Sequence, residues 1–305
     1  MTPRRRPAPD PRAGGSGDAN TAPAAAADVE RLGELVGRLR AAGCVFAEEE
    51  AALLATATED PAERESWCRR REAGEPLEQI IGWVQFAGDR YRLGPGVFVP
   101  RRRSEFLVER ALATVPTDLR RPVRVVEMCC GVGAIGLAIT RRLLGRKVAV
   151  EVHLADIDAS ALRWADRNGS SLPSPSVHLS IRQGDLWTAV PPDLQGRVDL
   201  VVANAPYVPT AELAFLPGEA RDHEPAAALD GGADGVDLHR RILADTPRWL
   251  AAGGAVLIET SDRQAHLTAA AMTEAGLTVR IDHDAERAAT AVTGWQATHR
   301  PGRPG

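Results

Sequence analysis

One stretch of the sequence, VRVVEMCCGVGAIG at residues 123–136, joins an apolar run to a glycine turn. The run from Val123 to Met128 predicts a buried strand, and the Ala-, Leu- and Ile-rich residues that follow, up to Leu144, predict a helix. Glycines allow a positive φ and a close approach of the backbone to a ligand, and the free N–H groups at a helix start favour polar or anionic ligand groups. The stretch is therefore typical of the start of a nucleotide-binding α/β domain.

The alternation of strands and helices continues along the chain. The predicted strands are 123–128, 148–155, 177–182, 198–203, 255–259, 277–282 and 291–297, and the predicted helices between them are 133–144, 159–168, 236–250 and 263–275. We therefore predict an α/β fold with a seven-stranded, mostly parallel, doubly wound sheet of Rossmann-like type and helices on both faces. The last two strands have no helix between them, so they should form a hairpin at one edge.

The predicted strand 198–203 ends on Asn204-Ala205-Pro206-Tyr207. Asn204 offers a side-chain carbonyl as an acceptor, and Ala205 precedes a proline, which restricts its backbone angles and the direction of its own carbonyl. Two acceptors at one point suit an NH2 group, and the ring of Tyr207 could cover a planar amide or base. The alternative is an ordinary turn at a strand end, because Asn and Pro are common turn residues.

Several other polar residues also follow predicted strands. In open sheets of this type, ligands bind beyond the carboxyl ends of the strands. The turn from Glu127 to Gly133, Asp156, Asp185 and Asn204 are all placed in this way, so one crevice can hold them. Asp156 lies about 20 residues after the glycines, where a carboxylate can bond a ribose diol.

Two ligands compete for this crevice. The pattern Gly131-x-Gly133-x-x-Gly136 fits the dinucleotide fingerprint of a nicotinamide dehydrogenase. S-adenosylmethionine also accounts for the acidic Glu127 before the turn and for Asp185 as an acceptor for an adenine amino group. Because a dehydrogenase gives the motif that starts at Asn204 no role, we favour the methyl donor.

The N-terminal part differs from the rest in composition and in the spacing of its apolar residues. Residues 1–27 are rich in Pro, Ala, Gly and Arg without periodicity, which predicts a disordered tail. Apolar residues at helical spacing predict a small helical domain at 28–74, and residues 75–100 predict a β-hairpin linker with strands at 80–86 and 91–93. A helix at 104–113, with Ser104 and Glu105 as its cap residues, then opens the larger domain, residues 101–305.

Composition narrows the functional classes. The chain has 305 residues, of which 44% are hydrophobic, and a net charge of -4, so we expect no stable nucleic-acid binding, although the arginines at 69–71 and 101–103 could touch phosphates locally. Four cysteines, at positions 44, 68, 129 and 130, form no C-x-x-C pair, which indicates a reducing, cytoplasmic environment and no metal site. No run of roughly 18 apolar residues is present, so we expect no membrane span.

A series of ordered motifs extends from Gly74 to Ala297. They are Gly74-Glu75-Pro76-Leu77 with Ile81-Gly82, Val99-Pro100-Arg101 with Ser104-Glu105, the glycine turn, Asp156 with Asn168, Gly184-Asp185, Asn204-Ala205-Pro206-Tyr207, Glu224-Pro225, residues 228–235 (ALDGGADG) and Glu259. In these residues the chain resembles the protein N5-glutamine methyltransferases that act on peptide chain release factors, class I S-adenosylmethionine-dependent enzymes with an N-terminal helical domain. The resemblance implies a class I methyltransferase fold and an acceptor protein that presents a glutamine, such as a release factor.

The resemblance also implies roles for single residues. The cofactor-binding residues would be Glu127, Cys129, Cys130, Gly131, Val132, Gly133, Asp156, Asp185, Leu186 and Asn204. The turn from Glu127 to Gly133 would hold the methionine part of S-adenosylmethionine, Asp156 the ribose, and Asp185 with Leu186 the adenine. Asn204 and the carbonyl of Ala205 would hold the glutamine amide, within a catalytic motif that Pro206 and Tyr207 complete. The helical domain would recognise the acceptor protein.

Three positions depart from the family pattern. Ala205 replaces the first of two prolines, which removes a fixed φ and should weaken positioning. Cys129 replaces the first glycine of the turn, which requires ordinary backbone angles there and narrows the pocket. Arg102 replaces a proline at the entrance. Two further functions stay open. One is a methyltransferase for an exocyclic amino group of a nucleic-acid base, which would use the motif at Asn204 in the same way. The other is a donor-binding protein in which Ala205 and Cys129 mark a decayed site.

The connection from Val208 to Gly235 is long for a compact domain, and long loops are usually functional. Glu224 lies within it. This residue is either an ordinary surface carboxylate or part of the substrate entrance.

Overall fold

The computed structural model describes residues 22–115, 121–173 and 175–296, with side chains from residue 29 onward. The chain divides into two compact units, Met1–Ala73 and Gly74–Gly305. Residues 1–21 of the predicted disordered tail lie outside the described residues. The first helix begins at Ala22, which is earlier than the predicted domain start at residue 28.

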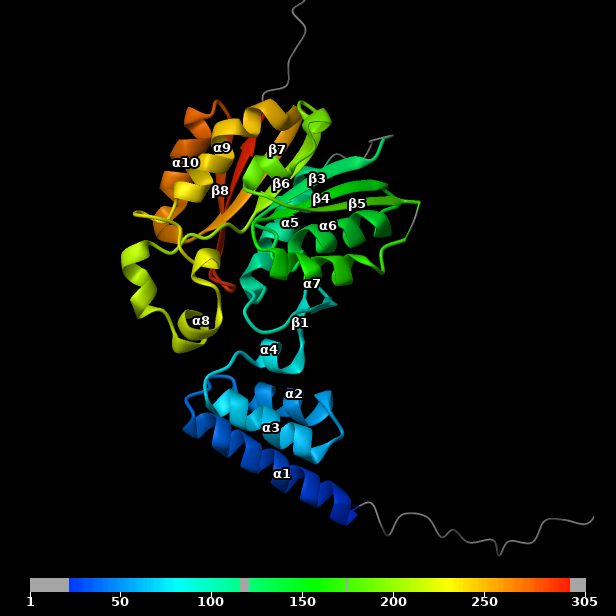
Figure 1. Ribbon diagram of the computed structural model, residues 1–305, viewed down its shortest axis with the longest axis vertical. Helices are drawn as coiled ribbons and strands as arrows, with labels where there is room; N and C mark the ends of the chain where they lie inside the picture. The colour runs from blue at the N-terminus through cyan, green and yellow to red at the C-terminus, as the bar shows by residue number, and fades with distance from the viewer. Residues whose placement is uncertain (1–21, 116–120, 174, 297–305) are drawn as a thin grey trace, which may run out of the picture. The chain divides into compact units, whose positions relative to one another are not determined.

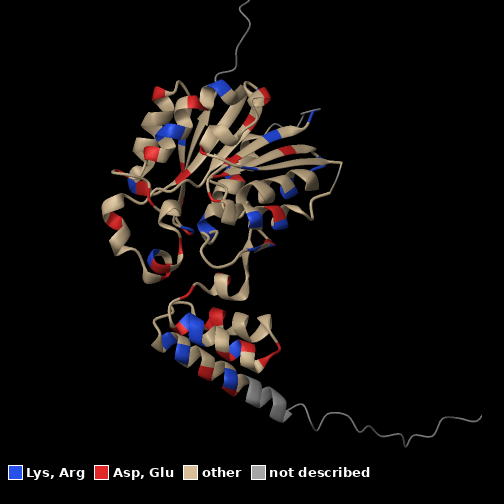
Figure 2. Ribbon diagram, viewed as in Figure 1, with Lys and Arg blue, Asp and Glu red and all other residues tan. Residues whose placement is uncertain are grey.

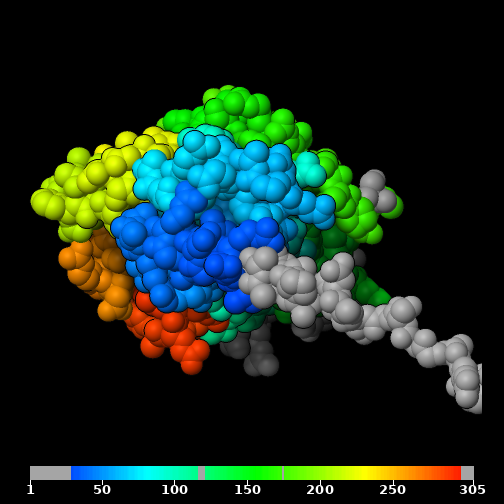
Figure 3. Space-filling model, turned by 90° about the horizontal axis from the view of Figure 1, so that it is seen from below, coloured from blue at the N-terminus to red at the C-terminus, as the bar shows by residue number. Residues whose placement is uncertain are grey.

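The described part of the first unit contains three helices, α1 (Ala22–Ala41), α2 (Ala47–Ala57) and α3 (Pro61–Glu72). Asp60 caps α3, because its side chain accepts a hydrogen bond from the N–H of Ala62 at 2.9 Å. Arg38 of α1 forms ion pairs at 2.7 Å with Glu65 and Glu72 of α3. Acidic and basic residues are interspersed along the helices of this unit (Figure 2), and its atoms are coloured blue to cyan in Figure 3.

The second unit is built on a seven-stranded sheet with the strand order β5-β4-β3-β6-β7-β9-β8. Its strands are β3 (Val123–Met128), β4 (Val150–Asp156), β5 (Val177–Gln183), β6 (Val198–Ala203), β7 (Leu250–Thr260), β8 (Thr278–Asp284) and β9 (Ala289–Trp295). Strands β3 to β7 pair in parallel, and β9 pairs antiparallel with both β7 and β8. The predicted seven-stranded, mostly parallel sheet is confirmed, and β8 and β9 form the predicted hairpin at one edge.

Helices cover both faces of this sheet (Figure 1). They are α5 (Glu105–Thr114), α6 (Ala134–Gly145) and α7 (Ala159–Gly169) on one face, and α9 (Asp237–Trp249) and α10 (Ala265–Glu274) on the other. Val125 lies in the core under α6, and its neighbour Val126 lies in the core on the opposite face, because successive side chains of a strand alternate. Within the described ranges, none of the helices is both long and apolar enough to cross a bilayer.

Parallel pairing brings the ends of three strands together. Met128 at the end of β3 is paired with Ala155 of β4 on one side and with Ala203 of β6 on the other. The glycine turn after Met128, Asp156 and Asn204 therefore lie at the same edge of the sheet.

The predicted hairpin before the sheet is present, but its first strand is shorter and its second strand begins earlier than expected. Strands β1 (Trp83–Phe86) and β2 (Asp89–Arg92) pair antiparallel. Ile80 and Ile81, which were expected in its first strand, instead belong to the short helix α4 (Leu77–Ile81). The helix ends at Gly82, whose φ of +84° is a left-handed conformation that suits glycine.

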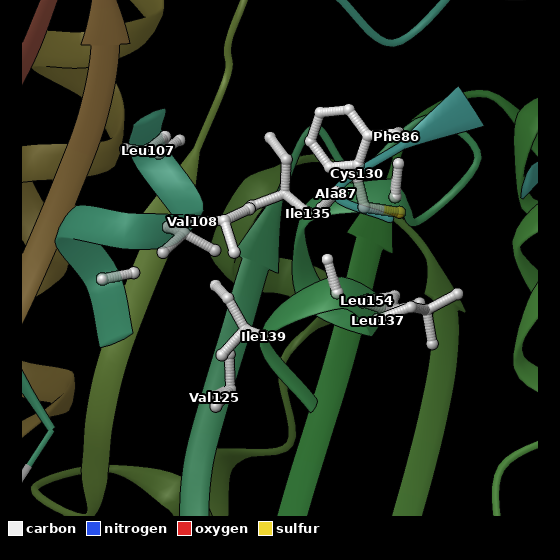
Figure 4. Close-up of a cluster of buried hydrophobic side chains, with 14 of the residues drawn as sticks. Phe86, Ala87, Leu107, Val108, Val125, Cys130, Ile135, Leu137, Ile139 and Leu154 are labelled. Atoms are coloured by element: carbon white, nitrogen blue, oxygen red, sulfur yellow. The ribbon is translucent and has the colours of Figure 1, made fainter. Parts of the chain in front are cut away.

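This hairpin packs into the core of the second unit rather than serving as a free linker. Figure 4 shows Phe86 and Ala87 beside Cys130 and Ile135, which lie in and after the glycine turn. Asn168 of α7 fastens the same contact: its Oδ1 accepts the N–H of Arg92 at 2.7 Å, and its Nδ2 donates to the carbonyls of Arg92 and Val132 at 3.0 Å. Hairpin and glycine turn are therefore held by one buried side chain.

The expectation that Ser104 and Glu105 cap the following helix is wrong. A 3-10 turn, η1 (Arg102–Ser104), precedes α5, and Ser104 makes no capping hydrogen bond. Its hydroxyl instead accepts a hydrogen bond from Asn204, and the carboxylate of Glu105 accepts the N–H of Ala87 in the hairpin. Both residues serve contacts with distant parts of the chain.

Candidate active site

A cavity of about 300 Å³ opens at the edge of the sheet where β3, β4 and β6 end. We call it the turn cavity. The predicted site residues that line it are Glu127, Cys129, Cys130, Gly131, Val132, Asp156, Asp185, Leu186, Asn204 and Pro206. Gly133, Ala205 and Tyr207 do not line it.

The glycine turn is shaped by close backbone approaches. The N–H of Gly131 donates to Oδ2 of Asp156 at 2.7 Å, which ties the turn to the end of β4. The N–H of Gly136 donates to Oε2 of Glu127 at 2.7 Å, and a Cβ at position 136 would lie 2.6 Å from that oxygen. Gly133 has a φ of +78° and precedes α6, and a Cβ at this position would lie 2.9 Å from Cδ1 of Leu154. Gly133 therefore serves the conformation of the turn, and it does not line the cavity.

The expectation that Cys129 requires ordinary backbone angles is wrong. Its φ is +52°, so the turn keeps the left-handed conformation at this position although the side chain is larger than that of glycine. Leu186, also on the cavity wall, has a φ of +49°. A non-glycine residue in this region costs on the order of 1–3 kcal/mol and persists only where its surroundings fix it, as they often do at binding sites.

The carboxyl groups of Glu127 and Asp156 in the turn cavity differ in their pKa shifts. Burial raises the pKa of Glu127 to about 8, against the lowering effect of the Gly136 N–H. Burial also raises the pKa of Asp156, while the N–H groups of Asp158 and Gly131 lower it. The N–H groups of Gly131 and Asp158 donate to Oδ2 and Oδ1 of Asp156, and a carboxylate has about four lone-pair sites, so it can also accept a donor from a ligand.

Asp185 has a partner that the sequence did not suggest. Its Oδ2 accepts a hydrogen bond at 2.6 Å from Arg241 of α9, and both side chains line the turn cavity. The contact spans 56 residues of chain, and no pattern near Arg241 marks it. One carboxylate oxygen of Asp185 remains for a ligand.

A second cavity, of about 330 Å³, adjoins the first. We call it the loop cavity, because the connection after β6 forms much of its wall. Ala205 and Tyr207 line it, together with Arg101 and Arg103. Four residues line both cavities: Phe98, Asn204, Pro206 and Ala228. Asn204 therefore stands at the junction of the two spaces.

The polar side chains around Asn204 form two hydrogen-bonded sets, which start from the adjacent residues Arg103 and Ser104 of η1. Nδ2 of Asn204 donates to Oγ of Ser104 at 3.3 Å, and Nη2 of Arg103 donates to the hydroxyl of Tyr207 at 2.6 Å. Nε of Arg103 also donates to the buried Glu259 at 3.2 Å. Burial raises the pKa of Tyr207 to about 12, so its hydroxyl stays protonated at neutral pH.

The long connection after β6 is anchored at Glu224, next to the short helix α8 (Gly218–His223). The Glu224 side chain is fully buried, accepts two hydrogen bonds from Arg101 at 2.6 and 2.7 Å, and accepts the N–H of Val99 at 3.1 Å. Of the two interpretations of Glu224, the structure therefore excludes an ordinary surface carboxylate. Its ion pair fixes one wall of the loop cavity.

The same connection packs its glycines against Tyr207. A Cβ at Gly231 would lie 2.6 Å from Cα of Tyr207 and 2.5 Å from the carbonyl oxygen of Gly235. Gln264 donates to the carbonyl of Tyr207 at 2.8 Å, and Val208 exchanges backbone hydrogen bonds with Leu229 and Gly231. These contacts constrain the backbone that follows Ala205, the position at which the first proline of the family pattern is missing.

Ala205 itself is buried and touches a histidine of α9. The backbone of Ala205 raises the pKa of His239, but burial is the larger effect and lowers it to about 4. Nδ1 of His239 lies 2.9 Å from the hydroxyl of Thr268. His239 is therefore neutral at physiological pH and supports the segment from inside.

Comparison with known proteins gives several matches. A family model described as the methyltransferase small domain matches residues 95–215. The release factor glutamine methyltransferase of Streptomyces coelicolor is 41% identical over 196 residues, which are 64% of this chain and 66% of that protein. The protein of the same name from Mycolicibacterium smegmatis is 38% identical over 202 residues, which are 66% of this chain and 67% of that protein.

A further relative carries a different name. The 4-amino-L-phenylalanine/4-methylamino-L-phenylalanine methyltransferase of Streptomyces pristinaespiralis is 35% identical over 201 residues, which are 65% of this chain and 65% of that protein. The chain thus spans about two thirds of the length of these relatives.

The strand order, with an antiparallel β9 inserted beside β7, and a cavity beyond the glycine turn together define a class I methyltransferase fold. Within this class, the chain belongs to the family of release factor glutamine methyltransferases.

Proposed function

We propose that the protein transfers a methyl group from S-adenosylmethionine to the side-chain amide nitrogen, N5, of a glutamine in a protein. The observation that carries this proposal is the position of Asn204, which lines both the turn cavity and the loop cavity. A side chain at this junction can touch an acceptor nitrogen on one side and the reactive end of a donor on the other.

The turn cavity fits S-adenosylmethionine in size and charge. Its volume of about 300 Å³ is in the range of small-molecule sites. Among the described residues, four acidic side chains line it, of Glu127, Asp156, Asp158 and Asp185, against one cation, Arg241, which is paired with Asp185. An acidic wall suits a ligand with a positive sulfonium and an ammonium group. Glu127 and the glycine turn would hold the methionine part, Asp156 the ribose, and Asp185 with Leu186 the adenine.

When bound, the donor supplies an electrophilic methyl group. The task of the chain is to orient a poor nucleophile, because the lone pair of an amide nitrogen is delocalised into its carbonyl. Oδ1 of Asn204 and the carbonyl of Ala205 would accept the two amide hydrogens, and the ring of Tyr207 would cover the amide plane. Good alignment alone can remove roughly 7–11 kcal/mol from such a barrier.

The helical unit is proposed to recognise the acceptor protein. Its surface presents mixed charges, and every residue that lines either cavity belongs to the second unit. Chemistry and recognition can therefore be assigned to separate parts of the chain. A peptide chain release factor is the first candidate acceptor, because the relatives from Streptomyces coelicolor and Mycolicibacterium smegmatis are named for it.

The test is methyl transfer in vitro from methyl-labelled S-adenosylmethionine to purified release factors, followed by tandem mass spectrometry. We expect label on the side-chain nitrogen of one glutamine. A release factor with asparagine at that position is the matched control, since it keeps the amide but shortens its reach, and it should remain unlabelled.

Parallel reactions separate the alternatives. Label only in nucleic acid would identify a base methyltransferase. Label only in a free aryl amine such as 4-amino-L-phenylalanine would indicate the kind of acceptor for which the Streptomyces pristinaespiralis relative is named. Donor binding without transfer to any acceptor would indicate a decayed site. Each of these results would contradict the proposal.

A further inference from the structure

The two functional side chains of the loop cavity are held by adjacent residues of one short turn. In η1, Ser104 accepts a hydrogen bond from Nδ2 of Asn204, and Arg103 donates one to the hydroxyl of Tyr207. Ser104 is almost fully buried, with 1% of its surface exposed. The contact between Ser104 and Asn204 joins residues 100 positions apart in the chain, so it belongs to the site and not to local turn geometry.

The orientation of the Asn204 carboxamide matters for any acceptor that carries an NH2 group. A carboxamide has an oxygen that accepts and a nitrogen that donates, and the two are nearly equal in size, so rotation by half a turn exchanges them. With Nδ2 on Ser104, Oδ1 of Asn204 is left without a donor among the described residues. In the rotated form, two NH2 groups would face each other and the acceptor would be repelled.

The turn that carries Ser104 is itself anchored on a buried carboxylate. Glu259 has 2% exposure, and its Oε1 accepts a hydrogen bond from Nε of Arg103 at 3.2 Å. Arg103 precedes Ser104 in η1, so this contact holds the Ser104 hydroxyl in place against Asn204.

With Ser104 held in this place, Asn204 presents its NH2 group to Ser104 and leaves its Oδ1 to the acceptor. We propose that Ser104 is a positioning residue that sets the orientation of the Asn204 carboxamide. This inference rests on the proposed function of the same site.

The first experiment observes the carboxamide directly and does not depend on activity. The side-chain amide signal of Asn204 in a ¹H–¹⁵N spectrum is assigned by its absence in Asn204→Ala. We expect Ser104→Ala to shift this signal, because Nδ2 loses its acceptor, and Ser104→Thr, which keeps a hydroxyl, to leave it near its place. Ser170→Ala, which removes an exposed hydroxyl at the end of α7, is the matched control. An unchanged signal in Ser104→Ala would overturn the inference.

The second experiment measures kinetics with a glutamine-bearing acceptor. Loss of one neutral hydrogen bond predicts that Ser104→Ala lowers kcat by about five- to tenfold, while Ser104→Thr stays within about twofold of the unsubstituted protein. In an Asn204→Ala background, Ser104→Ala should have no further effect, because Ser104 acts through Asn204. An equal loss in both backgrounds would show a merely structural role and contradict the inference.

The two readouts separate this inference from the proposed function. If the unsubstituted protein transfers no methyl group to glutamine, the proposed function fails, and the spectrum of Ser104→Ala still decides the orientation of Asn204. If transfer occurs and Ser104→Ala matches the unsubstituted protein in kcat, the inference fails while the proposed function stands.

Discussion

At the scale of single residues, the acidic side chain beside the glycine turn has an unusual environment. Glu127 is 2% exposed, accepts the N–H of Gly136, and borders the turn cavity. Burial disfavours its charged form, which raises its pKa to about 8 in the free protein. Below that pH the carboxyl is mostly protonated. A bound ammonium group would favour the carboxylate and expel the proton.

Donor binding should therefore depend on pH through Glu127. Because the carboxylate is the binding form, affinity for S-adenosylmethionine should rise with pH up to about 8, level off above it, and be accompanied by proton release below it. Calorimetric titration in two buffers of different ionisation enthalpy counts the protons released. In Glu127→Gln the affinity should be weaker and its slope with pH absent. Glu109→Gln, at an exposed ion pair with Arg287, is the control, and a slope that persists in Glu127→Gln would refute this role.

Some properties of single residues could be predicted from the sequence and others could not. The glycine turn, Asp156 and Asn204 were predicted to lie at one edge of the sheet because each directly follows a predicted strand. The left-handed φ of Cys129 was not predicted, since surrounding contacts and not the residue type impose it. Ser104 was wrongly predicted to be a helix cap because its actual partner, Asn204, lies 100 residues away in the sequence. A contact between residues so far apart leaves no pattern in the local sequence.

At the scale of elements, the glycine-rich end of the long connection fixes Tyr207. Residues 228–235 return to the sheet edge, and Gly231 lies against the backbone of Tyr207 and Gly235. Glycine at position 231 allows this close packing, because any side chain there would overlap two backbone segments. The ring of Tyr207 is thereby kept on the wall of the loop cavity.

A methyl group at this point should displace Tyr207. Gly231→Ala is expected to lower kcat on the order of 100-fold, as a shift of about 1 Å at a reacting centre can, with donor affinity nearly unchanged. Steady-state kinetics and donor titration measure the two effects. Gly145→Ala, at the end of α6 where a Cβ meets no atom within 4 Å, should leave both unchanged. A Gly231→Ala protein with normal kcat would show that the close packing is not needed.

The elements themselves were largely predictable. Apolar runs and helical periodicity gave the strands and helices of the sheet domain, because both signals are strong in a sheet buried on both faces. The error at Ile80 and Ile81 came from a short apolar run, which fits a buried helix as well as a strand. The packing of Phe86 on Cys130 needed the folded chain, since nothing in the hairpin sequence names its partner.

At the scale of the whole molecule, the two units divide the proposed tasks. Both cavities are lined by residues of Gly74–Gly305 alone. The first unit has its own ion pairs, between Arg38 and the two glutamates of α3, and its own buried residues, which include Leu39 and Leu54. Donor binding and methyl transfer should therefore not require the helical unit.

A shortened protein that starts at Gly74 tests this division. It should fold, bind S-adenosylmethionine with unchanged affinity and methylate a short glutamine peptide, while its KM for a full acceptor protein rises on the order of tenfold. Circular dichroism, calorimetry and steady-state kinetics measure these properties. A folded shortened protein with normal KM for the full acceptor would contradict a recognition role for the helices.

The most direct test of the account is the kinetics of Asn204→Ala. The account predicts that methyl incorporation into the glutamine amide falls on the order of 100-fold or more, because the acceptor nitrogen loses one of the two groups that orient it, while affinity for the donor changes by less than about threefold. Undiminished incorporation by a folded Asn204→Ala protein would show that the junction of the two cavities is not where the amide is held.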